Sequence, residues 1–139
     1  MMSLNALVGF FFSLATPKPC PALADIVFVI DSSGSLGPDN YNKEKKFTID
    51  IAKRFPIGPT GARFGCVIFS STAESMFDLS DDLDRASLEE ALEALPFLNA
   101  TTHTYKAFDL VSEEGMFAED NGGRNKAAKI IIFLTDGLS

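Results

Sequence analysis

The strongest constraint on the fold is a pair of continuous apolar runs, IVFVI at residues 26–30 and IIIFL at residues 130–134. Uninterrupted runs of β-branched, aliphatic and aromatic residues are typical of strands buried on both faces, as in parallel sheets. An aspartate follows each run within two residues, Asp31 in the first case and Asp136 in the second. Parallel strands end at the same edge of a sheet, so we expect the two acids to flank one shared site.

The rest of the chain alternates between strand-like and helix-like patterns. The predicted strands span residues 25–30, 63–69, 74–78 and 129–135. The predicted helices span residues 41–55, 80–95 and 105–117, and Ser80 and Asp81 are the candidate N-caps of the second. A short connection at residues 70–73 makes the third strand an antiparallel edge. The pattern predicts an α/β fold: a doubly wound, mostly parallel sheet with helices on both faces.

Length and charge exclude some classes of protein. A chain of 139 residues with 46% hydrophobic residues suits a single globular domain with a substantial core. The formal net charge is −7, and no basic cluster is long enough to follow a phosphate backbone. Nucleic acid is therefore not an expected partner.

The N-terminal segment has the features of a secretory signal peptide. Its apolar run, residues 4–15, is too short for a membrane span of about 20 residues. Cleavage after Ala15 is the first choice, with Ala22 and Ala24 as alternatives; no Lys or Arg precedes the run, so an ordinary buried segment is the competing interpretation. We predict that residues 1–23 form a signal peptide and proline-rich lead-in, that residues 24–139 form the domain, and that the protein is secreted.

The two cysteines do not define a disulfide scaffold. Cys66 lies within a predicted strand, where we expect a buried free thiol that packs as a small apolar side chain. Cys20 lies among prolines in the lead-in and has no evident partner in this sequence.

A cluster of oxygen-bearing side chains follows the first strand. Ser33 and Ser35 are two residues apart in a loop, and Gly34 between them permits a tight turn, so both hydroxyls can face one point beside Asp31 and Asp136. Oxygen ligands suit a hard divalent cation such as Mg²⁺ or Mn²⁺. One histidine and two separated cysteines do not make a zinc set.

Several ordered motifs resemble the von Willebrand factor type A (VWA) domain, as found in collagen VI, matrilins and integrin inserted domains. The sequence DSSGS at residues 31–35 is similar to the family's Asp-x-Ser-x-Ser metal motif. THTYKA at residues 102–107 resembles its threonine loop, and TDG at residues 135–137 resembles its third metal element. The resemblance covers about residue 24 to the end of the chain.

The resemblance implies a role for each site residue. Ser33, Ser35 and Thr102 would bind the metal through hydroxyls, whereas Asp31 and Asp136 would act through water or hydrogen bonds. Neutral direct ligands leave the cation able to attract an external anion. The implied function is a metal-ion-dependent adhesion site in an extracellular or matrix module, where Mg²⁺, or alternatively Mn²⁺ or Ca²⁺, binds an Asp or Glu carboxylate of a partner protein such as collagen.

Two other functions compete with adhesion. One is an intracellular VWA domain in a multiprotein assembly, which the apolar N-terminus disfavours. The other is a Mg²⁺-dependent phosphohydrolase with Asp31 as nucleophile. Such enzymes usually have a second acid two residues later, where this chain has Ser33. No nucleophile is paired with a base in the sequence, so we expect no catalysis.

Other motifs near the site leave alternatives open. Thr101 is an alternative to Thr102, although the Thr-x-Thr spacing to Thr104 favours Thr102, and His103 is expected to be an ordinary loop residue. Asn99 begins a glycosylation sequon, Asn-Ala-Thr, beside the predicted site. The aspartates between residues 78 and 84 lack calcium-loop spacing and are expected to cap helices.

The C-terminus departs from the family pattern. Ser139 comes just after the third metal element, whereas the family's domain continues with further helices and strands. The resemblance therefore implies a domain that is incomplete at its C-terminus, with a strand edge and apolar surface left exposed.

Overall fold

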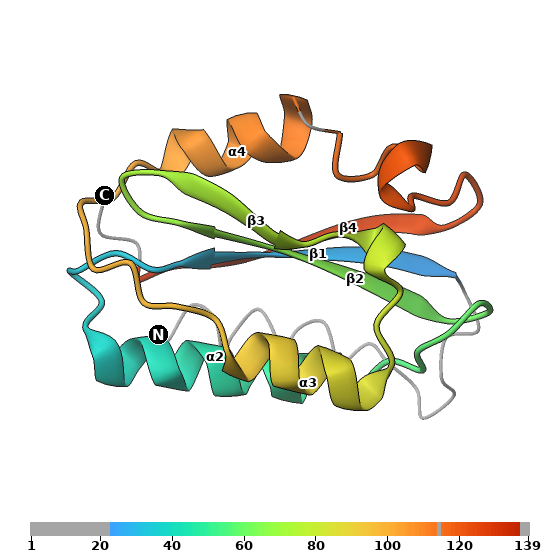
Figure 1. Ribbon diagram of the computed structural model, residues 1–139, viewed down its shortest axis with the longest axis horizontal. Coiled ribbons are helices and arrows are strands. Elements are labelled where there is room, and N and C mark those ends of the chain that lie inside the picture. The colour runs from blue at the N-terminus through green and yellow to red at the C-terminus, as the bar shows by residue number, and fades with distance from the viewer. Residues whose placement is uncertain (1–22, 114, 137–139) are drawn as a thin grey trace.

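The computed structural model describes residues 23–113 and 115–136, which form three layers with a sheet between two layers of helices (Figure 1). The predicted signal peptide and Cys20 lie outside the described residues. The strands are β1 (Ala24–Asp31), β2 (Ala62–Phe69), β3 (Ala73–Phe77) and β4 (Ala128–Leu134). The helices are α2 (Pro38–Ala52), α3 (Arg85–Glu93) and α4 (Thr104–Glu113), and short 3₁₀ turns span Leu79–Asp81 and Glu119–Asn121.

The four strands are arranged in the order β3-β2-β1-β4. β1 is parallel to both β2 and β4, and β3 is antiparallel to β2. Helices α2 and α3 cover one face of the sheet and α4 covers the other (Figure 1). The predicted fold class and the antiparallel edge strand are confirmed, and each strand boundary is within one residue of its predicted position. Because β2 and β4 lie on opposite sides of β1, the strand order reverses between β1 and β4, where the site was predicted.

The helix boundaries differ more from prediction than the strand boundaries. Helix α2 begins at Pro38, because proline at the first helical position has a suitable φ angle and its missing N–H leaves no hydrogen bond unmade. It ends at Ala52, three residues before the predicted end. Helix α4 begins at Thr104 and ends at Glu113, four residues before the predicted end.

The start of α3 was also predicted wrongly. Ser80 and Asp81 belong to a 3₁₀ turn that Asp78 caps, and Asp81 accepts a hydrogen bond from the Asp78 N–H in return. The helix begins at Arg85 because the Asp84 side chain accepts a hydrogen bond from the Ser87 N–H at 2.8 Å. Asp78 and Asp84 therefore act as caps, as predicted for this acidic stretch. Asp78 caps the 3₁₀ turn, and Asp84 caps the separate helix α3.

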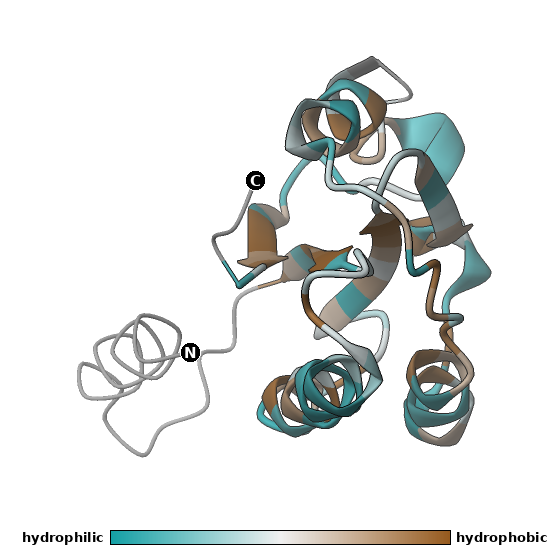
Figure 2. Ribbon diagram, turned by 90° about the vertical axis from the view of Figure 1, so that its left-hand side faces the viewer, coloured by the Kyte–Doolittle hydropathy of each residue, from teal (hydrophilic) through white to brown (hydrophobic). Residues whose placement is uncertain are grey.

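β1 is buried along its whole length because both faces of the sheet are covered there. Ile26, Phe28 and Ile30 belong to the core between the sheet and the α2/α3 layer, and Val27 and Val29 belong to the core under α4. Figure 2 shows much of this middle layer in brown, between helices that mix hydrophobic and hydrophilic residues. Alternate residues thus meet different helices, which explains the continuous apolar run.

Phe47, Ile51 and Phe55 recur at four-residue spacing, which predicts them as the buried stripe of a helix at residues 41–55, but α2 buries a different set of side chains. Ile51 is buried, but the two phenylalanines are only half-buried. The most enclosed side chains of the helix include Tyr41 and Glu44. Tyr41, Glu44 and Thr48 recur at three- and four-residue spacing on the buried face, which therefore carries a carboxyl group.

Candidate metal centre

Asp31 ends β1, and both of its carboxylate oxygens accept hydrogen bonds. Oδ1 accepts from the Ser33 N–H at 2.9 Å, and Oδ2 accepts from the Thr135 hydroxyl at 2.9 Å. The Asp31 side chain is fully buried. The carboxylate therefore connects the serine loop to the end of β4, which makes Asp31 an organising group with both oxygens already engaged.

The two serine hydroxyls lie together, as the sequence predicts. Ser33 Oγ and Ser35 Oγ are 3.1 Å apart, and Ser35 Oγ is 3.4 Å from Asp136 Oδ2. Ser33 is buried, Ser35 is exposed and Asp136 is half-buried. Residues separated by about a hundred positions thus form one group that is open to solvent on one side.

Backbone pairing brings the threonine segment to the same edge of the sheet. Ser33 pairs with Ala100 in an isolated parallel bridge, and the Gly34 N–H donates to the Ala100 carbonyl oxygen at 2.8 Å. Thr102 follows two residues later and is half-buried. Among the described residues its side chain makes no hydrogen bond, so the Thr102 hydroxyl is available to a ligand. Thr101 is exposed, on the outer side of the segment.

Sequence reasoning missed three residues that hold the loops in place. Ser32 Oγ donates to the Pro96 carbonyl oxygen at 3.1 Å and accepts from the Leu98 N–H at 2.8 Å. The Tyr41 hydroxyl donates to the same Pro96 oxygen at 2.8 Å. Burial raises the pKa of Tyr41 to about 12, so the hydroxyl keeps its proton. The third residue is Thr135, the partner of Asp31.

Thr135 and Ser32 had a local signal in the sequence, since each directly precedes a predicted site residue, whereas Tyr41 had none. Ser32 and Tyr41 contact a loop more than fifty positions away, and no short motif encodes such contacts. Their role follows from the packing of α2 beside the loop that leads from α3 to α4.

Glu44 places a buried carboxyl group beneath the site. Its side chain is 2% exposed, and its two carboxylate oxygens have no hydrogen-bond partner among the described residues. Burial, which is the largest cause, and the nearby charges of Asp31 and Asp136 together raise the pKa of Glu44 to about 8. The carboxyl group is therefore mainly protonated at neutral pH when no cation is bound.

The donor chemistry of this group fits a hard divalent cation. The hydroxyls of Ser33 and Ser35 and the Asp136 carboxylate supply oxygen ligands from one side, and the other side is open. Within residues 23–113 and 115–136, no three His, Cys, Asp or Glu side chains form a group that could hold a metal. A cation in this part of the chain would thus depend on hydroxyl ligands.

His103 lies close to this edge, and its contacts are those of an ordinary loop residue. Its backbone N–H donates to the Ser70 carbonyl oxygen at 2.7 Å, and its exposed ring stacks on Tyr105 with ring centres 5.9 Å apart. Asp31 is buried with both oxygens engaged, which is unsuited to a nucleophile.

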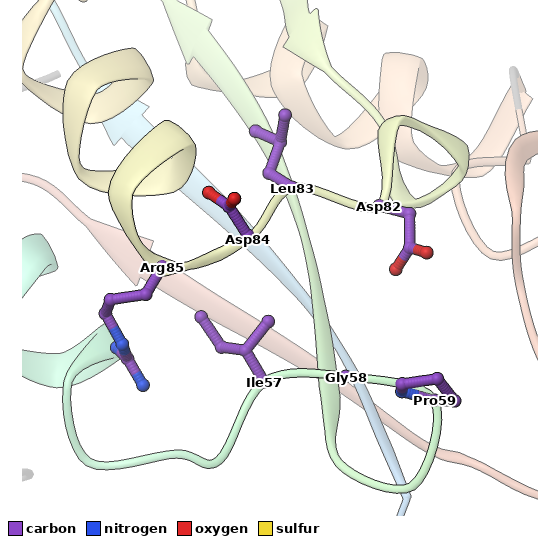
Figure 3. A pocket seen from close by; sticks show the side chains of 7 residues that line it. All are labelled: Ile57, Gly58, Pro59, Asp82, Leu83, Asp84 and Arg85. Carbon is purple, nitrogen blue, oxygen red and sulfur yellow. The ribbon is translucent and has the colours of Figure 1, made fainter.

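A separate pocket of about 350 Å³ lies at the opposite end of the sheet, between the loop before β2 and the start of α3 (Figure 3). Its polar groups are already engaged. Arg85 donates to the carbonyl oxygens of Ala52 and Phe55 at 2.8 and 2.6 Å, Asp84 caps α3, and Asp82 lies 3.5 Å from Arg63. The pocket therefore offers few groups to a ligand.

Comparison with known proteins agrees with this architecture. Residues 25–139 match the family model of the von Willebrand factor type A domain. The chain therefore belongs to the VWA family. No helix among the described residues is both long and apolar enough to cross a membrane.

The relatives include proteins of the extracellular matrix. The human collagen alpha-6(VI) chain is 33% identical over 125 residues, a match that covers 89% of this chain and 5% of the collagen chain. Human matrilin-1 is 32% identical over 116 residues, covering 81% of this chain and 23% of matrilin-1. This chain thus spans a small part of its relatives' length.

A solved structure shares both fold and family. Proximal thread matrix protein 1 from the mussel byssus, with a zinc-occupied MIDAS motif, superposes with a TM-score of 0.76 at 28% identity. The superposition covers 87% of this chain and 33% of the mussel protein. MIDAS is the metal-ion-dependent adhesion site of the family.

Proposed function

We propose that this chain is a non-enzymatic, secreted matrix adhesion module that binds an acidic side chain of a partner protein through a divalent cation. The observation that carries the proposal is the convergence of three side chains. Ser35 Oγ lies 3.1 Å from Ser33 Oγ and 3.4 Å from Asp136 Oδ2. Matrix relatives such as collagen VI and matrilin-1 support the adhesive role.

In this proposal each residue has a defined task. Ser33, Ser35 and Thr102 supply neutral hydroxyl ligands. Asp136 accepts a hydrogen bond from a metal-bound water or from the Ser35 hydroxyl. Asp31 fixes the serine loop through the Ser33 N–H and fixes the β4 end through Thr135. When bound, the cation supplies a positive charge that neutral ligands do not cancel, so a carboxylate of the partner can complete its coordination.

Ligand chemistry favours Mg²⁺ as the resident ion, with Mn²⁺ and Ca²⁺ as alternatives. The mussel relative holds zinc in its MIDAS motif, so Zn²⁺ belongs in any comparison of ions. A matrix protein such as collagen is a suitable partner class because it can present Asp or Glu side chains.

Isothermal titration of Mg²⁺ into the full chain tests the site. Binding should be lost in the Ser33→Ala, Ser35→Ala double variant. The matched control is a Thr60→Ala, Ser112→Ala double variant, which removes two exposed hydroxyls elsewhere and should bind as the original chain does. Equal Mg²⁺ binding by all three proteins would exclude the proposed site. Titrations with Mn²⁺, Ca²⁺ and Zn²⁺ then rank the ions.

A further inference from the structure

The loop that carries Asn99 is fixed against the serine loop by backbone hydrogen bonds. The Asn99 N–H donates to the Ser32 carbonyl oxygen at 3.0 Å, and the next residue's carbonyl oxygen accepts from the Gly34 N–H at 2.8 Å. Position 99 therefore has a defined place at the rim of the candidate metal centre. Anything attached to Asn99 must project from that rim.

The side chain of Asn99 meets the requirements of an attachment point. The residue is exposed, and among the described residues no hydrogen bond engages its side-chain amide. Its φ angle is 51°, in the left-handed region that asparagine tolerates better than most residues. Thr101, which completes the Asn-Ala-Thr sequon, is exposed as well.

The local packing directs the amide over the serine loop. A Cβ atom added to Gly34 would lie 2.8 Å from Asn99 Oδ1, so the carboxamide occupies the space that a side chain at position 34 would need. Gly34 stands between the two serines whose hydroxyls converge. The amide oxygen faces this loop, and the residue as a whole is exposed to solvent.

We propose that Asn99 carries an N-linked glycan in the secreted protein and that this glycan limits the size of the partner surface that reaches the metal centre. The steric part of the inference rests on the proposed function, because it assumes that partners bind at this edge. A glycan is bulky and hydrated, so it excludes broad surfaces from the Asn99 side. A metal ion or a narrow acidic segment still passes.

Occupancy is tested by expressing the full chain in cultured animal cells and treating the secreted protein with an endoglycosidase that releases N-linked glycans. The original chain and a Thr101→Ser variant should lose mass on treatment, because serine also completes the sequon. A Thr101→Ala variant should show no change while retaining Asn99. A secreted original chain without a glycan, or an unglycosylated chain kept in the cytosol, overturns the proposal.

The steric effect is tested with a reactive thiol in the serine loop. In a Cys20→Ser, Ser35→Cys variant, the new thiol is labelled with either a small maleimide or a maleimide attached to a long polyethylene glycol chain. Removal of the sequon through Thr101→Ala should accelerate the large reagent several-fold and leave the small reagent unchanged. Equal rates with and without the glycan overturn the steric part.

These readouts are independent of metal binding. Loss of the Mg²⁺ titration signal in the original chain would count against the proposed function, whereas the mass change and labelling rates would still report on Asn99. Mg²⁺ affinity should differ little between the glycosylated and the enzymatically treated protein, since a hydrated ion is small compared with a glycan.

Discussion

β1 and β4 have nearly the same sequence character but different environments. Each is an apolar run followed by an aspartate, and their residues are paired in parallel register from Ala24 with Ala128 to Ile30 with Leu134. β1 is buried throughout, whereas Ile131 in β4 is 47% exposed. The difference arises because β1 has a neighbouring strand on both sides and β4 pairs only with β1 among the described residues.

The comparison separates strand formation from strand burial. β-branched and aromatic residues specify an extended segment in either place. Helix coverage then decides how much apolar surface is removed from water. On the α4 side, Phe133 stacks between Phe69 and Phe108 with ring centres 5.3 Å apart in both pairs, yet Phe108 is itself 54% exposed. Thus β4 is partly covered by aromatic rings at its C-terminal end and open at Ile131.

The largest contrast should come from truncating one apolar side chain in each strand. Phe28→Ala should lower the free energy of unfolding by about 3–5 kcal/mol, because Phe28 is fully buried and stacks on Phe64. Ile131→Ala should lower it by less than about 1 kcal/mol, because half of that side chain already contacts water. Urea unfolding of both variants measures the difference, and equal losses would contradict it.

The covering helix adds a pH-dependent contrast. The folded protein keeps the Glu44 proton up to a pKa of about 8, whereas the unfolded chain releases it near the ordinary value of 4.5. The contribution of Glu44 to the free energy of unfolding is therefore fully present below about pH 4.5. It is lost as the pH rises to about 8, by about 1.4 kcal/mol per pH unit. Glu44→Gln should remove this slope in unfolding measurements made with a metal chelator.

The exposed Glu93→Gln variant is the control for Glu44→Gln and should keep the slope of the original chain. If the two variants and the original chain had parallel stability profiles between pH 5 and pH 8, Glu44 would not be the group that titrates.

An ion pair joins the N-terminal end of β1 to the loop before β4. Arg124 Nη2 is 2.8 Å from Asp25 Oδ1, and the backbone N–H of Arg124 donates to Asp25 Oδ2 at 2.7 Å. Arg124→Ala should destabilise the fold by about 3 kcal/mol, because it leaves the fully buried Asp25 carboxylate without its cation. Lys129→Ala, at the exposed β4 residue in register with Asp25, should change stability by less than about 0.5 kcal/mol. Chemical unfolding distinguishes the two outcomes.

The smallest contrast concerns the two aspartates at the strand ends. Asp31→Asn should cost about 1–2 kcal/mol, because an amide nitrogen cannot accept the hydrogen bond from Thr135. Asp136→Asn, at a half-buried position, should cost less than about 1 kcal/mol. Both should weaken Mg²⁺ binding under the proposed function. Unfolding with a chelator and titration with Mg²⁺ separate the two effects, and an Asp136→Asn variant that is the less stable of the two would reverse the assignment.

The sequence predicted the strands better than the helix ends. Strand positions follow from apolar runs bounded by turn residues, and each boundary was within one residue. Helix ends depend on single capping contacts, such as that of Asp84 with the Ser87 N–H, and several nearby aspartates were equally plausible caps. Residues 105–117 were predicted as one helix that ends before the chain breaker at residues 120–123, yet α4 ends at Glu113, shortly before Gly115, which has a φ of 59°.

The convergence of the serine hydroxyls was predictable because Ser33 and Ser35 are near neighbours in one loop. Their link to Asp136 depends on β1 and β4 being adjacent parallel strands, which the two apolar runs with an acid after each suggested and the strand pairing confirms. The roles of Tyr41 and Glu44 were not predictable, since each depends on how α2 crosses the sheet, and the role of Ser32 depends on the loop at Pro96 that packs beside it. The metal-binding roles of the site residues, the modification of Asn99 and the identity of the metal remain predictions.

The sequence by itself determined the α/β alternation, the buried strands and the presence of oxygen-bearing side chains at two strand ends. These features are local, since they depend on the periodicity of apolar residues and on residues adjacent in the chain. The tertiary structure alone decided that β1 is central and β4 lies at the edge of the described sheet, that Asp31 uses both oxygens to organise the site, and that Glu44 is buried. Those outcomes depend on contacts between residues far apart in sequence, which no local pattern encodes.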